Sequence, residues 1–104
     1  MTRGPRYAPA AERSLDAIAD WTFDRFGPRQ ARRYVAAIRA TCDRVARGDM
    51  PSRSVREAFA PEAPEDLRFV REGAHLILFR EREGEVEITD VLHGAMDLPG
   101  RVRG

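Results

Sequence analysis

Two histidines and one cysteine are the side chains of this sequence best suited to acid–base or nucleophilic chemistry near neutral pH. His93 stands at the expected end of a strand and is the better candidate for a general acid or base. His75 begins an expected strand, where we predict a turn or edge residue. Cys42 lies on the apolar side of an expected helix, so we predict a buried, unreactive thiol. Two separate histidines without a cysteine pair do not indicate a metal site. We therefore predict no metal and no cofactor. We assign no catalytic residue, because His93 is better explained as a residue that ends the strand and packs beside the helices, and whether the protein is an enzyme stays open.

The charge pattern favours a protein that binds other proteins. All 18 basic residues are arginine, and 17 acidic residues nearly cancel them, which leaves a net charge of +1. Arginine suits bidentate contacts with carboxylates and phosphates, although a GC-rich genome would produce the same bias. A net charge this low is a weak footprint for nucleic-acid binding.

The length and composition indicate one folded domain, residues 1–104. The hydrophobic fraction is 42% and the charged fraction 34%, which argues against disorder. No apolar run approaches the roughly 18 residues of a membrane span. The first residues lead into no apolar stretch, so we expect no signal peptide. A bacterial or cytosolic protein, located in the cytoplasm, is the expected context.

Proline and glycine divide the first half of the chain into a short strand and two helices. Residues 6–8 are expected to form the strand, and helices are expected from about Pro9 to Phe26 and from Pro28 to about residue 47. Gly27 can adopt the left-handed conformation that ends a helix. Such a short joint predicts an antiparallel helical hairpin.

The second half changes to the period of two that is typical of strands. Residues 49–64 are expected to form a loop with one helical turn around residues 55–59. Three strands are then predicted at residues 67–71, 75–80 and 86–92. The predicted fold class is therefore α+β: an N-terminal strand, and a helical hairpin packed on an antiparallel sheet that includes a three-strand meander.

Two-residue turns at Glu72-Gly73 and Glu83-Gly84 define an expected register in which Arg80 lies opposite Glu87. One face of the sheet then carries Leu67, Phe69, Leu76, Leu78 and Val91. The other face carries Arg68, Val70, Ile77, Phe79, Val86, Ile88, Asp90 and Leu92.

Two helices can cover only one of these apolar faces, and we expect them to cover the face with Leu76 and Leu78. The other face is then left to the loop, to the C-terminal tail or to a partner protein, and a large uncovered apolar face would favour a partner. Six residues are expected to be almost fully buried: Leu15, Ile18, Val35, Ile38, Leu76 and Leu78.

Three stretches carry a family resemblance. They are residues 9–18 (PAAERSLDAI), residues 25–34 (RFGPRQARRY) and residues 91–98 (VLHGAMDL). In this order and spacing they resemble the RelE/ParE superfamily of toxins from bacterial type II toxin–antitoxin systems. The third stretch is specifically similar to ParE, with Ala95 at a position where many ParE-like sequences have arginine.

The resemblance implies a toxin that inhibits DNA gyrase by protein contact. It also implies a cognate antitoxin, usually with a ribbon-helix-helix DNA-binding half, that forms a hetero-oligomer with the toxin. Contact with DNA would then be indirect, through the antitoxin or gyrase. The residues expected to bind the target are His93, Met96, Asp97 and Leu98. Those expected to bind the antitoxin are Trp21, Arg68, Arg71, Ile77, Phe79, Val86 and Ile88.

Two alternatives remain open from the sequence. One is a RelE-like, ribosome-dependent messenger-RNA endonuclease, which would need an acid or base such as His93 and cations such as Arg68, Arg71 and Arg80 for the phosphate. The other is a degenerate toxin retained for antitoxin binding, because Ala95 departs from the family pattern.

Overall fold

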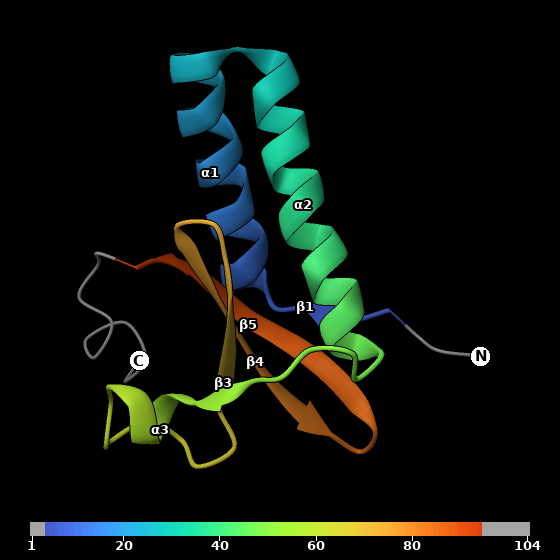
Figure 1. Cartoon of the computed structure of the whole chain (residues 1–104), viewed down its shortest axis with the longest axis vertical. Helices are drawn as coiled ribbons and strands as arrows, with labels where there is room; N and C mark the ends of the chain where they lie inside the picture. The colour runs from blue at the N-terminus through green and yellow to red at the C-terminus, as the bar shows by residue number, and fades with distance from the viewer. Residues whose placement is uncertain (1–3, 95–104) are drawn as a thin grey trace.

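A helical hairpin stands on one face of a five-stranded sheet (Figure 1). The computed structural model of the chain describes residues 4–94. Strand β1, Arg6–Tyr7, leads into helix α1, Pro9–Phe26, and helix α2, Pro28–Ala46, runs back antiparallel to it. The hairpin predicted from the sequence is confirmed, with boundaries within about one residue of those expected.

Gly27 connects the two helices with φ of 88°, a conformation that favours glycine. Its N–H donates to the carbonyl of Phe23 at 2.8 Å, which closes α1, and its own carbonyl accepts from the N–H of Ala31 at 3.1 Å. Pro28 occupies the first turn of α2, where its missing N–H costs nothing. The single residue between the helices therefore fixes their antiparallel course.

The sheet is mixed, with the order β1-β5-β4-β3-β2. Its other strands are β2 (Arg53–Ser54), β3 (Arg68–Glu72), β4 (His75–Arg82) and β5 (Glu85–His93), and the short helix α3 (Val55–Ala58) follows β2. The meander β3-β4-β5 is antiparallel as predicted, whereas β1 pairs in parallel with β5. The two-residue strand β2 was not predicted, because it is too short to show a periodicity.

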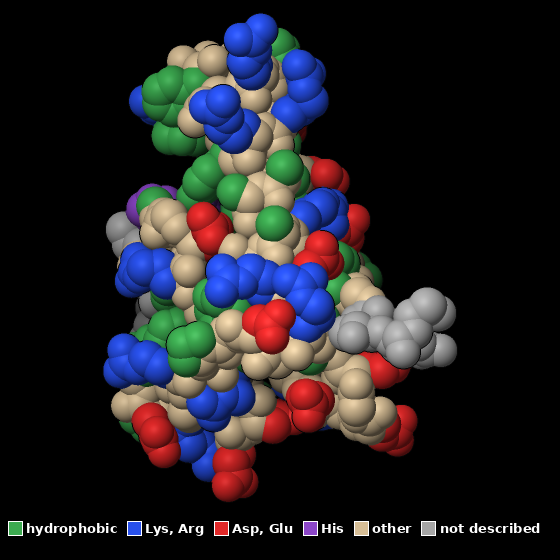
Figure 2. Space-filling view, turned by 45° about the vertical axis from the view of Figure 1, so that its right-hand side comes forward, with side chains coloured by type: hydrophobic (Ala, Val, Ile, Leu, Met, Phe, Trp, Pro, Cys, Tyr) green, Lys and Arg blue, Asp and Glu red, His purple; other side chains and the backbone are tan. Residues whose placement is uncertain are grey.

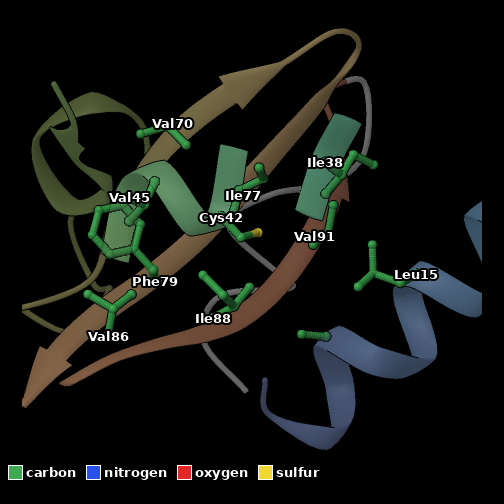
Figure 3. Packing of buried hydrophobic residues seen from close by; sticks show 11 residues of the cluster. Leu15, Ile38, Cys42, Val45, Val70, Ile77, Phe79, Val86, Ile88 and Val91 are labelled. Atoms are coloured by element: carbon green, nitrogen blue, oxygen red, sulfur yellow. The ribbon is translucent and has the colours of Figure 1, made fainter. Parts of the chain in front are cut away.

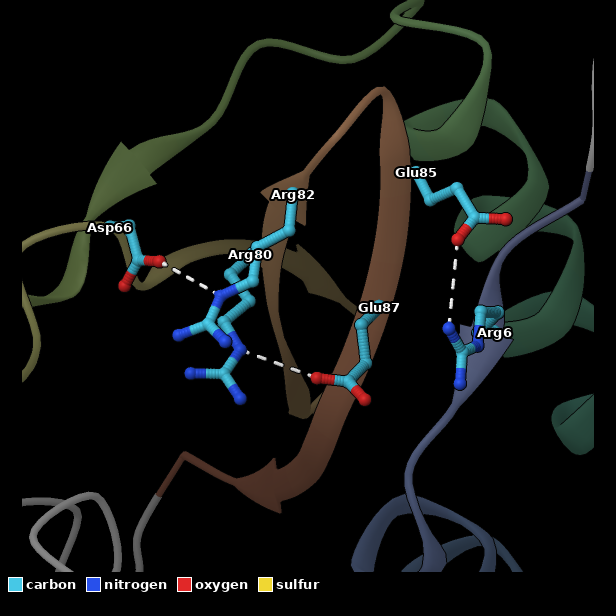
Figure 4. Close-up of polar contacts among 6 residues, drawn as sticks. All are labelled: Arg6, Asp66, Arg80, Arg82, Glu85 and Glu87. Carbon is cyan, nitrogen blue, oxygen red and sulfur yellow. Dashed lines mark hydrogen bonds and ion pairs between the residues drawn. The ribbon is translucent and has the colours of Figure 1, made fainter.

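The register of the meander is close to the predicted one. Glu72 lies opposite His75, so the first turn is Gly73-Ala74 and the pairing is offset by two residues from the prediction. An offset of two keeps every side chain on its predicted face. Arg80 lies opposite Glu87, and their side chains form a predicted cross-strand ion pair at 3.2 Å (Figure 4).

An irregularity in β5 changes two side-chain positions. Leu78 pairs with Asp90 and Phe79 pairs with Ile88, which leaves Thr89 as an extra residue. Such a β-bulge reverses the alternation beyond it. Val91 therefore joins the face with Ile77 and Leu92 joins the face with Leu78, opposite to the prediction.

The prediction of which face the hairpin covers is wrong. Leu15, Ile38 and Cys42 from the helices pack on Ile77 and the apolar residues of its face (Figure 3). The four residues predicted as an open antitoxin surface are thus buried, with exposed fractions between 0% and 7%: Ile77, Phe79, Val86 and Ile88. Side chains beneath two helices cannot contact a partner in the folded protein.

The segment from α3 to β3 covers the opposite face of the sheet. Val55, Ala60 and Ala63 are buried against Leu76 and Leu78, and Phe59 packs its ring 5.3 Å from that of Phe69. The period-two pattern divides the residues between the faces correctly. It does not distinguish which of two equally apolar faces meets the helices.

The outer half of the hairpin extends beyond the sheet (Figure 1). For this reason Ile18 and Val35 are only partly buried, whereas Leu15 and Ile38, nearer the sheet, are 2% and 0% exposed. The burial prediction is confirmed for these last two and for Leu76 and Leu78, and it is wrong for Ile18 and Val35. Neither long helix in residues 4–94 is apolar enough to cross a membrane.

Replacing Leu78 by alanine should lower the free energy of unfolding by about 2–5 kcal/mol, because the side chain is 2% exposed and its loss leaves a cavity. Phe26→Ala is the control, since Phe26 is 64% exposed and should change stability by less than about 0.5 kcal/mol. Urea denaturation measures both values. Equal effects of the two substitutions would contradict the packing of the α3 segment.

Candidate functional site

A groove of about 730 Å³ runs along α1 between the hairpin and one end of the sheet. Its walls come from α1, from the start of α2 and from the β3–β4 turn, and the outer ends of β4 and β5 close it. Its lining includes Ser14, Ile18, Trp21, Phe26, Tyr34, His75 and His93. The lining is largely apolar with a few polar groups, as is typical of binding sites.

Small side chains on α1 make room for the groove. Ala10, Ser14, Ala17 and Trp21 follow one another at helical spacing and face it. Leu15 lies on the neighbouring side of the same helix and fills the core. The spacing along residues 9–26 predicted the helix but not a second face that lines a groove. The small residues Ala10, Ser14 and Ala17 before Trp21 are the signal that could have revealed it.

The polar end of the groove is built around His75. The hydroxyl of Tyr34 lies 2.5 Å from Nδ1 of His75, and the rings of His75 and His93 meet edge to face at 5.3 Å. Partial burial, with a smaller contribution from His93, holds the pKa of His75 below its ordinary value. Burial also raises the pKa of Tyr34. At neutral pH the pair is therefore an uncharged imidazole and a protonated phenol.

Two contacts hold α2 to the β3–β4 turn at this end. Gly73 lies so close to Tyr34 that a Cβ there would stand 3.0 Å from the phenolic oxygen, and its φ of 59° also favours glycine. Thr41 donates a hydrogen bond to Glu72 Oε1 at 2.5 Å. The positive φ and the crowding by Tyr34 thus both favour glycine in this turn, and the two contacts hold this wall of the groove in place.

Asp90, next to the bulge in β5, anchors two residues that line the groove, Ser14 and Val91. One carboxylate oxygen of Asp90 accepts the Ser14 hydroxyl at 2.6 Å and the N–H of Val91 at 2.8 Å. This carboxylate ties α1 to β5 and satisfies a backbone N–H of that strand. The groove therefore lies between elements that are hydrogen-bonded to each other.

The structure brings some of the predicted site residues to this groove and separates others. Trp21, 55% exposed, and His93 line it. The Arg71 guanidinium lies close to Gly94, next to the end of the groove that His93 lines: a Cβ built on Gly94 would be 3.5 Å from Nη1 of Arg71. Arg68 is held at the other end of β3 by hydrogen bonds to Ser52. Met96, Asp97 and Leu98, expected to bind the target, lie outside the described residues.

The titratable residues of the core are structural. Cys42 is fully buried, and burial raises its pKa to about 11, so the thiol remains protonated at neutral pH. Among residues 4–94, no group of three or more His, Cys, Asp or Glu side chains is arranged to hold a metal ion. The arrangement at the groove suits the binding of an apolar polypeptide segment with a few hydrogen-bonding groups.

Comparison with known proteins supports this view of the chain. Residues 6–98 match the family model of the ParE toxin of type II toxin–antitoxin system, parDE. The chain is 32% identical over 92 residues to Toxin ParE1 of Mycobacterium tuberculosis, with 88% of this chain and 89% of that protein covered. It is also 32% identical over 93 residues to Toxin ParE of Escherichia coli, with coverage of 88% and 85%.

A solved structure shows the same fold. It is described as the chromosomal ParDE TA system from P. aeruginosa, and it superposes with a TM-score of 0.67 at 20% identity. The similarity covers 88% of this chain and 96% of that chain. The RelE/ParE fold expected from the sequence is therefore confirmed.

Replacing His75 by glutamine should flatten the pH dependence of stability below pH 6.5. Folding lowers the pKa of His75 below its ordinary value of 6.5. Between the folded-state pKa and 6.5, the unfolded chain therefore binds more protons than the folded one. The free energy of unfolding of the wild type therefore falls as the pH drops below 6.5. Denaturation at about pH 7.5 and about pH 5.5 measures the difference. Parallel profiles for wild type and variant would contradict the neutral form of His75.

Proposed function

We propose, on the premise that this chain belongs to the ParE family of toxins from type II toxin–antitoxin systems, that it inhibits DNA gyrase through protein–protein contacts. The observation that carries the proposal is the family match over residues 6–98, which includes the stretch expected to contact the target. In that stretch we assign the target contact to His93, Met96, Asp97 and Leu98. Because gyrase acts in the cytoplasm, the proposal places the toxin there.

A cognate antitoxin neutralises the toxin by laying a segment into the groove. The sheet face that the sequence predicted as the antitoxin surface is buried under the hairpin. The groove, by contrast, has apolar walls and a half-exposed Trp21. Arg13 in the groove wall and Arg71 at its end can receive acidic side chains of that segment. The complex is a hetero-oligomer, and a ribbon-helix-helix half of the antitoxin would supply its contact with DNA.

The geometry favours binding over RNA cleavage at this site. Nδ1 of His75 is engaged by Tyr34, and its lowered pKa leaves little protonated imidazole to act as a general acid at neutral pH. His93 lies beside it and is the remaining histidine that a ribonuclease mechanism would use. The endonuclease alternative therefore requires His93 as the general acid or base, whereas gyrase inhibition does not, so a substitution of His93 distinguishes the two.

The purified protein should inhibit DNA supercoiling by gyrase and leave ribosome-bound messenger RNA intact. His93→Ala should alter inhibition only as far as it weakens target contact, so its effect should be overcome at higher toxin concentration. Supercoiling assays and mapping of message ends measure the two activities. Cleaved messages that disappear with folded His93→Ala protein would establish the endonuclease instead. Inactivity in both assays, with antitoxin still bound, would indicate a degenerate toxin.

Trp21→Ala should weaken antitoxin binding by about 2 kcal/mol or more, because a large aromatic side chain would be lost from the groove wall. Phe23→Ala is a matched control: Phe23 is 54% exposed, close to the 55% of Trp21, but does not line the groove. Calorimetric titration with the cognate antitoxin measures both affinities. Equal losses for the two variants would move the antitoxin away from the groove.

A further inference from the structure

Basic side chains gather at the tip of the helical hairpin (Figure 2). Residues 25–42 contain five arginines and no acidic residue. Of the 18 arginines, 13 remain for the rest of the chain, which also holds all 17 acidic residues and so carries a net charge of −4. The small overall charge therefore conceals a local excess of positive charge on residues 25–42 of the hairpin.

The hairpin tip consists of the end of α1 and the first turns of α2. Its residues are Trp21, Arg25, Phe26, Arg29, Arg32 and Arg33, and all six are exposed. Asp20 and Asp24 lie on the last turns of α1, but within residues 4–94 neither forms an ion pair with Arg29, Arg32 or Arg33. The arginines of the tip are thus available to a partner.

The arrangement of these arginines is unfavourable for the protein alone. Arg29 lies in the first turn of α2, which contains no acidic residue, so its charge opposes the positive end of the helix dipole. Arg29 and Arg33 are four residues apart, a spacing at which like charges repel across one helical turn. An unfavourable arrangement of charges that no contact within the protein offsets is typical of a functional surface.

The aromatic residues of the tip favour a protein partner over a nucleic acid. Trp21 and Phe26 pack edge to face at 6.2 Å, and the Arg25 guanidinium lies 4.7 Å from the centre of the Trp21 ring. Trp21 therefore already stacks with a cation on one face and is less suited to stack with a base. The exposed aromatic area, beside arginine, is instead typical of the centre of a protein interface.

We propose that the hairpin tip docks onto an acidic protein surface of the toxin's target, as a contact additional to that of residues 93–98. The inference rests on the proposed function, and it specifies the chemistry of the target surface. Carboxylates of the target would offset the repulsion among the arginines and the unfavourable helix dipole. Since Trp21 and Phe26 belong to both the tip and the groove, a segment bound in the groove would also occlude the tip.

The test compares two charge-reversed variants with equal net charge. The tip variant is Arg29→Glu with Arg33→Glu, and the control is Arg44→Glu with Arg47→Glu, at the other end of α2, where both residues are exposed. The tip variant should inhibit gyrase at least about tenfold less well at low salt, and the loss should shrink as salt screens the charges. The control loses the Arg47–Asp49 ion pair and places glutamate at the C-terminal end of α2, so its Tm is measured as well. At a temperature at which it is folded, the control should inhibit as the wild type does.

Thermal unfolding separates docking from folding. Glutamate near the N-terminus of α2 interacts favourably with the helix dipole, so the tip variant should not melt below the wild type. A loss of inhibition together with an unchanged or raised Tm supports docking at the tip. A loss that follows a lowered Tm would overturn it.

The remaining outcomes are distinct. Wild-type potency in the tip variant would overturn the inference and leave the proposed function in place. An equal loss of gyrase inhibition in the tip and control variants would mean that only the net charge of the toxin matters, and would also overturn the inference. Salt-dependent binding of the wild type to duplex DNA without gyrase, lost in the tip variant, would assign the tip to nucleic acid instead. A wild type without effect on gyrase would overturn the proposed function, and this inference with it.

Discussion

The central strand of this protein is apolar on both sides, and the rest of the structure depends on covering it. Leu76, Ile77, Leu78 and Phe79 are consecutive residues of β4, and all four are buried. Side chains of consecutive strand residues point to opposite faces, so neither face of the sheet can remain open to water. The helical hairpin covers one face and the segment around α3 covers the other.

The hairpin is longer than the face that it covers. At 1.5 Å per residue, α1 extends roughly 27 Å, and its inner turns, with Ala11 and Leu15, supply its share of the core. The outer turns stand clear of the sheet (Figure 1), which leaves Trp21, Phe23 and Phe26 more than half exposed. These outer turns of the hairpin also form one wall of the groove. One packing requirement thus produces both the stable core and the surfaces open to partners.

The groove and the hairpin tip are chemically different but share residues. The groove is apolar with an uncharged Tyr34–His75 pair at one end, whereas the tip is basic around Arg29 and Arg33. Trp21 belongs to both. On the functions proposed above, an antitoxin segment in the groove competes directly with the target for the tip, so neutralisation would need no conformational change in the toxin.

The sequence by itself determined the order of the elements apart from β2, the antiparallel hairpin at Gly27, the Arg80–Glu87 pairing and the family. These are properties of local spacing, of single glycines and prolines, and of motifs read along the chain. It did not determine which sheet face lies under the helices, the exchange of Val91 and Leu92 at the bulge, or the groove. Only the tertiary structure decided these. Two apolar faces with the same period are equivalent until the helices are placed, and the groove exists only where small residues of α1 face the ends of strands distant in the chain.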